Sequence, residues 1–359
     1  MKRICFIFNH FQFQDGVCRS AIAMANHLAK LDGLEITILS IYKFEKKTLS
    51  YLDPKIKATS IFKTYFRGFA KVVGIIPHKI LYKHYLKGKF DIEIAFQYGT
   101  SYHIINSCSK PAGVTRIGWI HGYDMSYKWF YLKMDQIVCV SKEGAKKASS
   151  DLDNKVPVTY CYNPIDDERV VCQGMESIPI ESAHDVLRFV TVGRLSPEKG
   201  YNRLIRIFCQ LKKEGYSFSL WIIGDGPEKS KLERLISDNK LTDSIHLLGA
   251  QRNPHAYTAK TDVFICSSFS EGYSTSCTEA LMLGIPIITT KVGGAQEIIS
   301  DSECGILTEI DDESLYGGIK SVLDNPSIIK EWKNTLNRTK VRFSANERLG
   351  QLLKILQID

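Results

Sequence analysis

The sequence predicts an α/β fold in which two parallel sheets are each covered by helices. Short continuous apolar runs, typical of strands buried on both faces, alternate with longer segments of helical period. This alternation occurs in two series, which a polar stretch without periodicity separates. The 359 residues are also a typical length for two domains.

The individual elements follow from the same pattern. Strands are expected at residues 4–8, 34–42, 91–96, 117–122, 136–141, 188–193, 219–226, 245–249, 262–268 and 286–290. Two helices each place apolar residues on one face, the first with Leu204, Ile205, Phe208 and Leu211 before Gly215, and the second with Leu232, Leu235 and Ile236. Helices that alternate with strands in this way form crossovers between parallel strands.

The two series also define the expected domains. We expect an N-terminal Rossmann-like domain at residues 1–165 and a C-terminal one at residues 187–339. The linker is placed at residues 166–186, where Pro, Gly, Ser and acidic residues lie without clear period. The tail at residues 340–359 is expected to be helical, because its leucines recur at helical spacing.

Composition narrows the class of protein. With 44% hydrophobic and 24% charged residues the chain can bury a large core, and its formal net charge of +8 favours anionic partners. No apolar run reaches the roughly 18 residues that span a bilayer, and the N-terminus is better explained as a first strand than as a signal peptide. None of the ten cysteines forms a CxxC pair, so we expect reduced thiols in a cytoplasmic protein.

Residues 41–90 are strongly basic. They hold twelve basic and two acidic residues, a net charge of +10. The interleaved aromatic residues include Tyr42, Phe44, Tyr51, Phe62, Tyr65, Phe66, Phe69, Tyr82 and Tyr85. Because each basic residue near an anionic membrane contributes about 1 kcal/mol, we expect this segment to contact such a surface. A solvated basic face is the alternative, and nucleic-acid binding is less favoured because no such motif accompanies the segment.

The first candidate site residues follow a predicted strand, in the segment VGRLSPEKG at 192–200. Gly193 allows a sharp turn, after which Arg194 and Lys199 stand at the carboxyl edge of the sheet, where ligands bind in open α/β folds. A forked guanidinium and a mobile ammonium together suit a diphosphate. Taken alone, the pair is better explained as two surface cations.

A second group follows the strand at 262–268. Glu271 lies in the loop and Glu279, eight residues later, on the next helix. Gly272 allows close backbone approach, and Thr275 or Ser276 is expected to cap the helix, so that the amides of 273–276 face an anion. A carboxylate on such a helix suits the hydroxyls of a ribose, and one in the loop suits those of a sugar. Each Glu alone could be an exposed helix residue.

These residues together carry a resemblance to a known family. The spacing from Arg194 to Lys199 and from Glu271 to Glu279 resembles the signature of retaining GT-B glycosyltransferases of family GT4. The similarity extends to residues 222–228, 261–268, 286–299, 118–124, 140–144 and 162–166. It implies a GT-B fold, with two Rossmann-like domains whose parallel sheets face each other across an inter-domain cleft, and a C-terminal helix packed back onto the first domain.

The resemblance also implies roles. Arg194 and Lys199 would hold the donor diphosphate and neutralise the charge of the leaving group. Glu279 would bind the nucleotide ribose. Glu271 would bind the donor sugar, helped by the amides of Gly272 and Tyr273. The donor site would further include Gly16, Arg252, Ser274 and Thr275.

In the first domain, the resemblance implies that His121 lies beside the reacting sugar, although a buried core histidine is the alternative. Gly16 would approach the phosphates, but the family has two glycines where this chain has Asp15 and Gly16. The segment near Gln251 and Arg252 would meet the base.

The implied reaction is a retaining transfer without a metal. When the diphosphate leaves, positive charge develops on the sugar and negative charge on the phosphate. One preorganised hydrogen-bond donor beside the negative charge stabilises the transition state by about 3–4 kcal/mol. The only D-x-D pattern, Asp151 to Asp153, lies in a polar segment and is interpreted as surface. Because no carboxylate nucleophile is assured, a front-face transfer through an oxocarbenium-like state is expected. Domain closure would then assemble His121 with the residues of the second domain.

The expected donor is a UDP-sugar, with a GDP-sugar as alternative, and no cofactor or metal is expected. The acceptor would be a lipid-linked or membrane-presented glycan, in capsule, exopolysaccharide or lipopolysaccharide synthesis on the inner face of the plasma membrane. Three other classes of protein fit the sequence less well. An NAD-dependent oxidoreductase would need GxGxxG, of which residues 224–229 supply two glycines. A GT-B phosphorylase would need a pyridoxal-binding lysine, and a non-catalytic two-lobed sugar-binding protein would be secreted.

Overall fold

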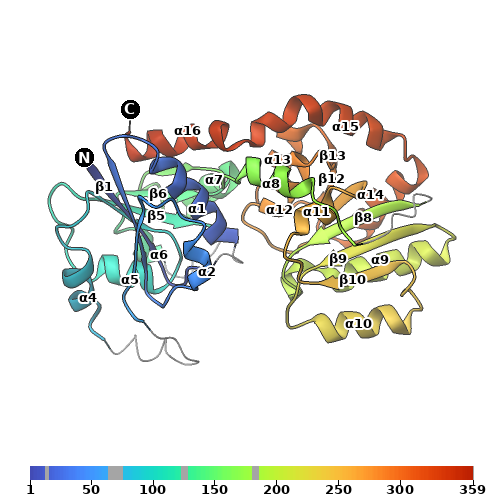
Figure 1. Cartoon of the computed structure of the whole chain (residues 1–359), viewed down its shortest axis with the longest axis horizontal. Coiled ribbons are helices and arrows are strands. Elements are labelled where there is room, and N and C mark those ends of the chain that lie inside the picture. The colour runs from blue at the N-terminus through green and yellow to red at the C-terminus, as the bar shows by residue number, and fades with distance from the viewer. Residues whose placement is uncertain (13–15, 64–75, 123–127, 180–185, 359) are drawn as a thin grey trace. The chain divides into compact units, whose positions relative to one another are not determined.

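The computed structural model divides the chain into two compact units. Unit 1 comprises Met1–Pro164 and Arg348–Asp359, and unit 2 comprises Ile165–Glu347. The structure describes residues 1–12, 16–63, 76–122, 128–179 and 186–358 (Figure 1). No described helix is both long enough and apolar enough to cross a membrane.

Unit 1 is built on seven parallel strands in the order β3-β2-β1-β4-β5-β6-β7. Its strands are β1 (Lys2–Phe8), β2 (Leu34–Ser40), β3 (Lys57–Ser60), β4 (Ile92–Ala95), β5 (Thr115–Ile120), β6 (Gln136–Cys139) and β7 (Val158–Tyr160). Its helices before the second unit are α1 (Gly16–Leu28), α2 (Lys46–Leu49), α4 (His78–Tyr85), α5 (Thr100–Asn106), α6 (Lys128–Tyr131) and α7 (Lys142–Asp151). The central strands are fully buried because helices cover both faces of the sheet.

Unit 2 is built on six parallel strands in the order β10-β9-β8-β11-β12-β13. Its strands are β8 (Leu187–Val192), β9 (Phe218–Ile223), β10 (Ile245–Gly249), β11 (Val263–Cys266), β12 (Ile287–Thr290) and β13 (Gly305–Thr308). Its helices are α8 (Asp167–Gly174), α9 (Tyr201–Lys213), α10 (Lys229–Asp238), α11 (Pro254–Thr258), α12 (Thr275–Met282), α13 (Ala295–Ser302), α14 (Asp312–Asp324) and α15 (Ile328–Thr339), with short 3-10 turns at Pro197–Lys199 and Lys340–Phe343.

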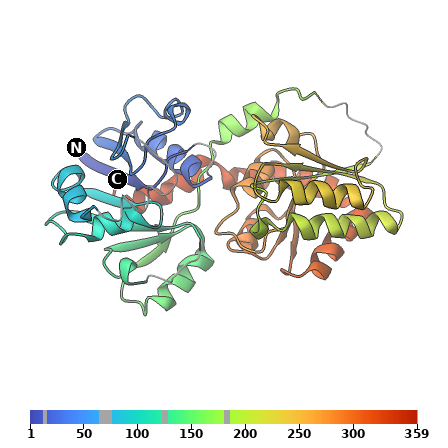
Figure 2. The same cartoon turned by 90° about the horizontal axis from the view of Figure 1, so that it is seen from below.

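One face of the unit 2 sheet is covered by α9, α10 and α14. The apolar stripe expected on the first of these is buried, with Leu204, Phe208 and Leu211 fully enclosed. Gly215, just beyond the helix, has φ +93°, the left-handed conformation that ends helices. Figure 2 shows α9 and α10 side by side, and residues of both pack into one core with α14. Connections on the other side of β8 place α12 and α13 on the opposite face, as right-handed crossovers require.

The C-terminal helix α16 (Ala345–Leu356) packs on unit 1 from Arg348 onward. The guanidinium of Arg348 donates to the carbonyl oxygen of Asn163 at 3.0 Å and lies 5.4 Å from the centre of the Tyr162 ring. At its far end, the Lys2 ammonium donates to the carbonyl oxygen of Leu356 at 3.0 Å. These contacts attach the end of the chain to the first strand of the first sheet.

The structure differs from the sequence prediction at two kinds of place. The segment 166–186, expected to be a linker without regular structure, contains α8, whose first turn is capped by the Asp166 side chain accepting from the Arg169 amide at 3.1 Å. Residues 180–185 of that segment lie outside the described residues. Three strands were not predicted at all, namely β3, β7 and β13, and each lies at the edge of its sheet.

Candidate functional site

The loops that follow β8 and β11 meet at one edge of the unit 2 sheet. β8 is the first strand of this sheet and lies between β9 and β11, so the chain winds away from β8 on one side and returns on the other. In open α/β sheets, ligands bind outside the carboxyl ends of the strands where the strand order reverses in this way. The loops at 193–200 and 267–274 are therefore the candidate binding edge of this unit.

Gly200 allows these two loops to lie directly against each other. It has φ +68°, and a Cβ atom there would lie 2.2 Å from the carbonyl oxygen of Ser267. The hydroxyl of Ser267 donates to the carbonyl oxygen of Lys199 at 2.9 Å. The amide of Phe269 donates to the carbonyl oxygen of Glu198 at 2.7 Å. Only glycine fits here, because any side chain would push the loops apart.

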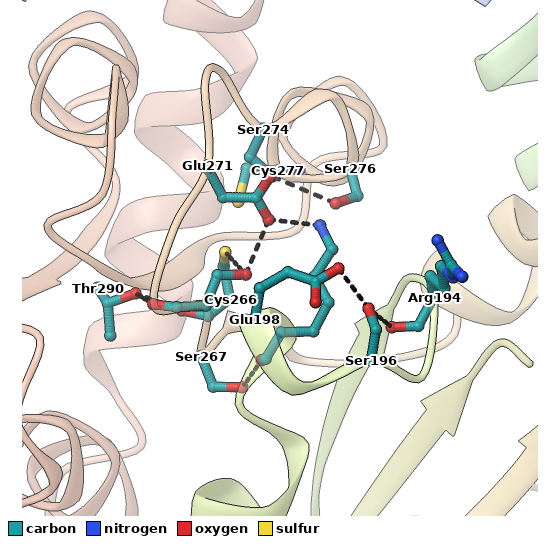
Figure 3. Close-up of polar contacts among 12 residues, drawn as sticks. Arg194, Ser196, Glu198, Cys266, Ser267, Glu271, Ser274, Ser276, Cys277 and Thr290 are labelled. Atoms are coloured by element: carbon teal, nitrogen blue, oxygen red, sulfur yellow. Dashed lines mark hydrogen bonds and ion pairs between the residues drawn. The ribbon is translucent and has the colours of Figure 1, made fainter. Parts of the chain in front are cut away.

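The joined loops bring Lys199 and Glu271 together. The Lys199 Nζ lies 2.5 Å from Glu271 Oε1, and the Ser268 hydroxyl donates to the same oxygen at 2.8 Å (Figure 3). The two charged side chains are 24% and 15% exposed. Burial lowers the pKa of Lys199, but the charge and hydrogen bond of Glu271 more than offset this, so the pKa is raised. The site therefore holds a charged ammonium at neutral pH.

Arg194 opens the loop after β8 and its side chain is exposed. In Figure 3 its guanidinium lies beyond Ser196 and apart from Glu271. The amide of Ser196 donates to the carbonyl oxygen of Arg194 at 2.9 Å, which closes this turn. The structure thus places Arg194 at the same sheet edge as Lys199 but outside the ion pair.

The amino end of α12 is capped by Ser274. Its hydroxyl accepts from the amide of Cys277 at 3.3 Å, and the Ser276 hydroxyl lies 3.2 Å from it. The expectation that Thr275 or Ser276 caps this helix was wrong by one residue, because Ser274 is the residue with extended backbone before the first turn. Thr275 instead begins the helix, so its amide is among those that no intrahelical carbonyl satisfies.

Two glycines after β12 support the loop that carries Glu271. A Cβ atom on Gly293 would lie 2.5 Å from the carbonyl oxygen of Glu271 and 2.8 Å from that of Gly272. A Cβ atom on Gly294 would lie 2.5 Å from the Tyr273 ring. Tyr273 is itself 5% exposed, so it anchors the loop rather than facing solvent. The loop therefore rests directly on the backbone of its neighbour and has little freedom to move.

Glu279 lies within α12 and is nearly enclosed, not exposed as an ordinary surface helix residue would be. Its Oε2 is 3.3 Å from Nε2 of His255, on α11, and the two side chains are 11% and 4% exposed. The other ring nitrogen of His255 lies 2.9 Å from the side-chain oxygen of Gln173, on α8. Asn253 also donates to the backbone of Gln173 at 2.9 Å. Sequence reasoning missed His255 and Gln173, since nothing in the local pattern marks them.

Arg252, expected near the base of the nucleotide, follows β10 and is exposed. It stands two residues before α11 and therefore close in sequence to His255. The adjoining Gln251 donates to the carbonyl oxygen of Leu248 at 2.6 Å, which closes the turn after the strand. Because parallel strands end at the same edge, the loops carrying Arg252, Arg194 and Glu271 all emerge on one side of the sheet.

Backbone packing explains the glycines at 224 and 226 without a bound dinucleotide. A Cβ atom on Gly224 would lie 1.8 Å from the carbonyl oxygen of Gly193, and one on Gly226 would lie 2.4 Å from that of Leu195. The amide of Leu195 donates to the carbonyl oxygen of Asp225 at 2.9 Å, so the two loops are also joined by a backbone hydrogen bond. These glycines let the loop after β9 pack on the loop after β8.

The D-x-D pattern lies at the end of α7. Asp153 has φ +53° and its carboxylate is 3.1 Å from the ammonium of Lys155. Both side chains are more than half exposed. The pattern is therefore part of a charged helix terminus on the surface of unit 1.

His121 belongs to unit 1, where it follows β5. Its ring lies 4.6 Å from the centre of the Phe96 ring and 6.5 Å from that of Trp119, and both ring nitrogens are shielded from solvent. Burial lowers its pKa to about 3, against a weaker opposing effect of the Phe96 backbone. The imidazole is therefore neutral at pH 7 and holds no charge for acid catalysis.

Gly16 also belongs to unit 1 and is the first residue of α1. Its partner in the expected pair, Asp15, lies outside the described residues. The loop before it is held to the end of β4, because the amides of Asn9 and His10 donate to the side-chain oxygen of Gln97 at 3.0 and 3.1 Å. Gly16 thus follows the edge where the strand order of unit 1 reverses.

The basic segment 41–90 is described in part. Residues outside the described part are Tyr65, Phe66, Arg67, Phe69 and Lys71. The described lysine side chains of the segment are exposed. Several of the aromatic residues are not at the surface, and Tyr82 is fully buried with its hydroxyl donating to Glu93 at 2.9 Å. The charge of the segment is therefore at the surface, whereas part of its aromatic content builds the core.

Comparisons with known proteins relate part of unit 2 to a known family. Residues 177–339 match the family model described as Glycosyl transferases group 1. A protein of Campylobacter jejuni, N-acetylgalactosamine-N,N'-diacetylbacillosaminyl-diphospho-undecaprenol 4-alpha-N-acetylgalactosaminyltransferase, is 33% identical over 190 residues, which cover 52% of this chain and 49% of that protein. The lipopolysaccharide core biosynthesis glycosyltransferase LpsE of Rhizobium meliloti is 26% identical over 273 residues, or 76% of each chain. The chain thus spans about half the length of the Campylobacter relative.

Among solved structures, HepE of Anabaena in complex with UDP matches with a TM-score of 0.75 at 17% identity, covering 99% of this chain and 100% of that one. At this identity the match concerns the fold. Two parallel sheets of seven and six strands, each with its strand order reversed beside the first strand, agree with that fold. The expected GT-B fold is confirmed by this likeness, and within it residues 177–339 are similar to the family Glycosyl transferases group 1.

Proposed function

We propose that the protein is a retaining, metal-independent glycosyltransferase of the GT4 kind. It moves a sugar from a nucleotide-sugar to a lipid-linked or membrane-presented glycan in the synthesis of a cell-surface polysaccharide. The observation that carries the proposal is the half-buried pair of Lys199 and Glu271 at the point where the strand order of unit 2 reverses. A cation and a carboxylate in contact at that edge suit a ligand that joins a diphosphate to a sugar.

The donor would lie along the amino end of α12. Amides at its first turn and the partial positive charge of the helix suit the diphosphate, next to the ammonium of Lys199. Arg194, on the same sheet edge and exposed, adds a mobile second cation. Glu279 would take the ribose hydroxyls, because its side chain is only 11% exposed and its Oε2 lies 3.3 Å from Nε2 of His255, which limits the positions the carboxylate can adopt. Arg252 would lie near the base.

Binding of the donor would change the partner of Lys199. In the free protein its ammonium is neutralised by Glu271. A diphosphate offers stronger acceptors, so Lys199 would turn to the phosphate and leave Glu271 to accept hydrogen bonds from the sugar hydroxyls. The ion pair thus keeps both groups oriented before the donor arrives and avoids an uncompensated buried charge.

In the transfer, the bond between the anomeric carbon and the diphosphate oxygen breaks, and its electron pair leaves with the phosphate. The acceptor hydroxyl oxygen attacks the same face of the sugar, and its proton passes to the departing phosphate oxygen. Lys199 and Arg194 stabilise the charge that develops there, an effect worth about 3–4 kcal/mol for one preorganised donor. His121, being neutral, would serve through hydrogen bonding to the sugar once the two units close on the substrates.

The nature of donor and acceptor is supported by the relatives. The Anabaena structure contains UDP, which favours a UDP-sugar over a GDP-sugar. The Campylobacter relative is named for transfer onto a diphospho-undecaprenol, a lipid-linked glycan, and the Rhizobium relative for lipopolysaccharide core biosynthesis. Together with the basic segment 41–90, this supports a peripheral position on the anionic inner face of the plasma membrane.

A screen of nucleotide-sugars tests the proposal. The purified protein is incubated with single UDP- and GDP-sugars and lipid-linked acceptors, with and without EDTA, and products are read by mass spectrometry. We expect transfer from a UDP-sugar, retention of the anomeric configuration, and no loss with EDTA. A protein stabilised against heat by NAD but not by UDP would instead be an oxidoreductase, and one that binds sugars but never hydrolyses or transfers them would be a binding protein.

A further inference from the structure

Arg203 is an arginine buried beside the candidate site, and no step of the proposed reaction uses it. It lies in the first turn of α9 and is only 4% exposed. Its ion pair with Asp312, at the start of α14, is long at 3.8 Å, and that carboxylate is 62% exposed. Because a buried guanidinium stays charged, its removal from water must be offset by other contacts.

The guanidinium is bound mainly by backbone carbonyl groups of two loops. Its Nε and Nη2 donate to the carbonyl oxygen of Ser267 at 3.0 and 2.6 Å, and Nη2 also donates to that of Ser268 at 2.9 Å. Its Nη1 donates to the carbonyl oxygen of Ile310, in the loop before α14. A planar fork with fixed donor directions can hold three carbonyl groups at once, unlike a compact ammonium. Arg203 therefore joins the loop after β11 to the loop after β13.

The two serines connect this anchor to the charged pair. The Ser267 hydroxyl donates to the carbonyl oxygen of Lys199 at 2.9 Å, and the Ser268 hydroxyl donates to Glu271 Oε1 at 2.8 Å; both contacts are drawn in Figure 3. Each member of the pair thus contacts a serine whose own carbonyl group is held by Arg203. One guanidinium thereby supports the backbone of Lys199 and the carboxylate of Glu271.

Phe269 covers one face of the guanidinium. The centre of its ring lies 3.8 Å from Cζ of Arg203, within the range of a cation–π contact. The residue is 48% exposed, and its amide donates to the carbonyl oxygen of Glu198 at 2.7 Å. The ring therefore shields Arg203 from solvent, which explains why a large apolar side chain stands at the surface here.

We propose that Arg203 is a positioning residue of the donor site, which sets the Lys199 backbone and the Glu271 carboxylate through Ser267 and Ser268. The inference rests on the proposed function, because that function assigns the pair to the diphosphate and the sugar of the donor. Arg203 itself contacts neither, since its donors are directed at carbonyl groups. Without the fork the pair would shift, and a misplacement of about 1 Å can lower a rate about a hundredfold.

An arginine that only stabilises the fold is the alternative, and unit 2 contains such a residue for comparison. Arg188, at the start of β8, is 7% exposed, lies 4.9 Å from the centre of the Trp221 ring and donates to the carbonyl oxygen of Lys260 at 3.0 Å. It thus shares with Arg203 its burial, an aromatic contact and a carbonyl acceptor. Because the loop that carries Lys199 follows the other end of β8, Arg188 is the matched control.

The variants Arg203→Lys and Arg188→Lys of the full-length protein test the proposal. Each keeps the charge and loses the fork, so both should unfold at a lower urea concentration than the wild type. Arg203→Lys should also lower kcat for transfer about a hundredfold, whereas Arg188→Lys should keep the wild-type kcat. Calorimetric titration with UDP counts the folded sites per chain. A variant that is merely unfolded loses UDP sites and rate in the same proportion, whereas Arg203→Lys should lose rate per bound UDP.

A double-mutant cycle tests whether Arg203 acts through Ser268. Ser268→Ala removes the hydroxyl beside Glu271 and should lower kcat about tenfold, as the loss of a hydrogen bond to a charged group does. If Arg203→Lys has already released this serine, the double variant R203K/S268A should be about as slow as R203K alone. Losses that multiply would mean that Arg203 acts by another route.

Hydrogen exchange of the free protein reads the loop without any substrate. The amides of residues 267–276 should exchange faster in Arg203→Lys than in the wild type, and Arg188→Lys should leave them unchanged. If Arg203→Lys does not fold, Phe269→Leu takes its place, because it removes the ring from the guanidinium and changes a half-exposed side chain. It should speed exchange of the same amides and lower kcat about twofold to fivefold, the equivalent of an exposed cation–π contact.

Three results would overturn the inference: equal kcat in the two lysine variants, unchanged exchange at residues 267–276, or multiplying losses in the cycle. The proposed function fails in a different way, through a wild-type protein that neither binds UDP nor transfers a sugar. Faster exchange in Arg203→Lys would then still show that Arg203 holds the loop, but its role in a donor site would be lost.

Discussion

The two units share a reversal of strand order beside the first strand, but the side chains described at that edge differ in charge. In each, the first strand lies between the second and a strand that returns later, β4 in unit 1 and β11 in unit 2. At this edge, unit 2 holds the charged pair of Lys199 and Glu271. The described residues of unit 1 at this edge include neutral amides, with the Asn9 side chain accepting from the amide of Ser101 at 3.1 Å and Gln97 accepting from the neighbouring backbone.

The difference teaches that one topology can carry different chemistry at the same edge of a sheet. At this edge of unit 2 an ammonium and a carboxylate are in contact, which keeps both half-buried charges compensated. The described groups of unit 1 include amides and a neutral imidazole, which exchange hydrogen bonds without carrying charge. The position of the site comes from the topology, and its chemistry comes from a few side chains in the loops.

Removing the cation of unit 2 should have the largest effect. Lys199→Ala should lower kcat for transfer by about 10²–10³, because one preorganised donor at the leaving group is lost. Steady-state kinetics with the donor found in the screen would measure it. The control is Lys291→Ala, which breaks an exposed pair with Glu309 of the same type, at 3.2 Å and 48% and 64% exposure. That variant should change neither rate nor stability by more than about 0.5 kcal/mol. Equal rates for the two variants would contradict the claim that Lys199 acts at the leaving group.

Separating the loops of unit 2 should come next. Gly200→Ala places a Cβ atom 2.2 Å from the Ser267 carbonyl oxygen in a left-handed backbone, and should cost at least about 2 kcal/mol of unfolding free energy. Gly284→Ala, at φ +77° with nothing within 4 Å, meets only the backbone strain and should cost about 1 kcal/mol. Urea denaturation compares them. A Gly200→Ala protein no less stable than Gly284→Ala would mean that the contact between the loops is looser than described.

The neutral state of His121 in unit 1 can be tested through the pH dependence of the unfolding free energy. The pKa of His121 is lowered to about 3 by burial, whereas the unfolded chain binds this proton near pH 6.5. The unfolded state thus binds more protons between these values, and stability must fall as pH falls through that window. Between pH 7.5 and 5, the wild type should lose about 2 kcal/mol more unfolding free energy than His121→Gln. Urea titrations at both pH values would show this, and parallel losses would mean that the ring is charged or solvated.

The smallest expected effect concerns how Glu279 is held. His255→Ala should raise KM for the donor about tenfold and change kcat little, because it removes the ring beside a carboxylate that we propose to contact the ribose, far from the bond that breaks. His255→Gln, which retains a donor, should recover part of the affinity. A lower kcat with unchanged KM would contradict a positioning role. A His255→Ala protein that unfolds, with no recovery of donor affinity in His255→Gln, would contradict it as well.

The sequence predicted the interior strands of both sheets and the edge strand β10, but not the other three edge strands. The predicted strands are continuous apolar runs and were found within a few residues. The edge strands β3, β7 and β13 were missed because none of them is a run of buried apolar residues: β3 reads as Lys-Ala-Thr-Ser with mostly exposed side chains, and most side chains of β7 and β13 are only half-buried. Such a strand is stabilised by pairing with its neighbour and not by a pattern of its own, so tertiary context decides it.

The site was predictable to the extent that it is local. Lys199 and Glu271 each follow a predicted strand, and their types suggested a ligand before any contact was known. Their meeting depends on strand order, which periodicity does not reveal. His255 and Gln173 were missed for the same reason, since 82 residues separate them and only the packing of α8 against α11 joins them. The Ser274 cap was missed because three neighbouring hydroxyl residues compete for the position.

Calorimetric titration of UDP tests the central claim most directly. The account predicts that UDP binds the full-length protein without added metal, that NAD does not, and that Lys199→Ala weakens UDP binding by about tenfold or more while Lys291→Ala leaves it unchanged. UDP bound equally by all three proteins, or by none of them, would mean that the paired charges beside Gly200 do not receive a nucleotide diphosphate.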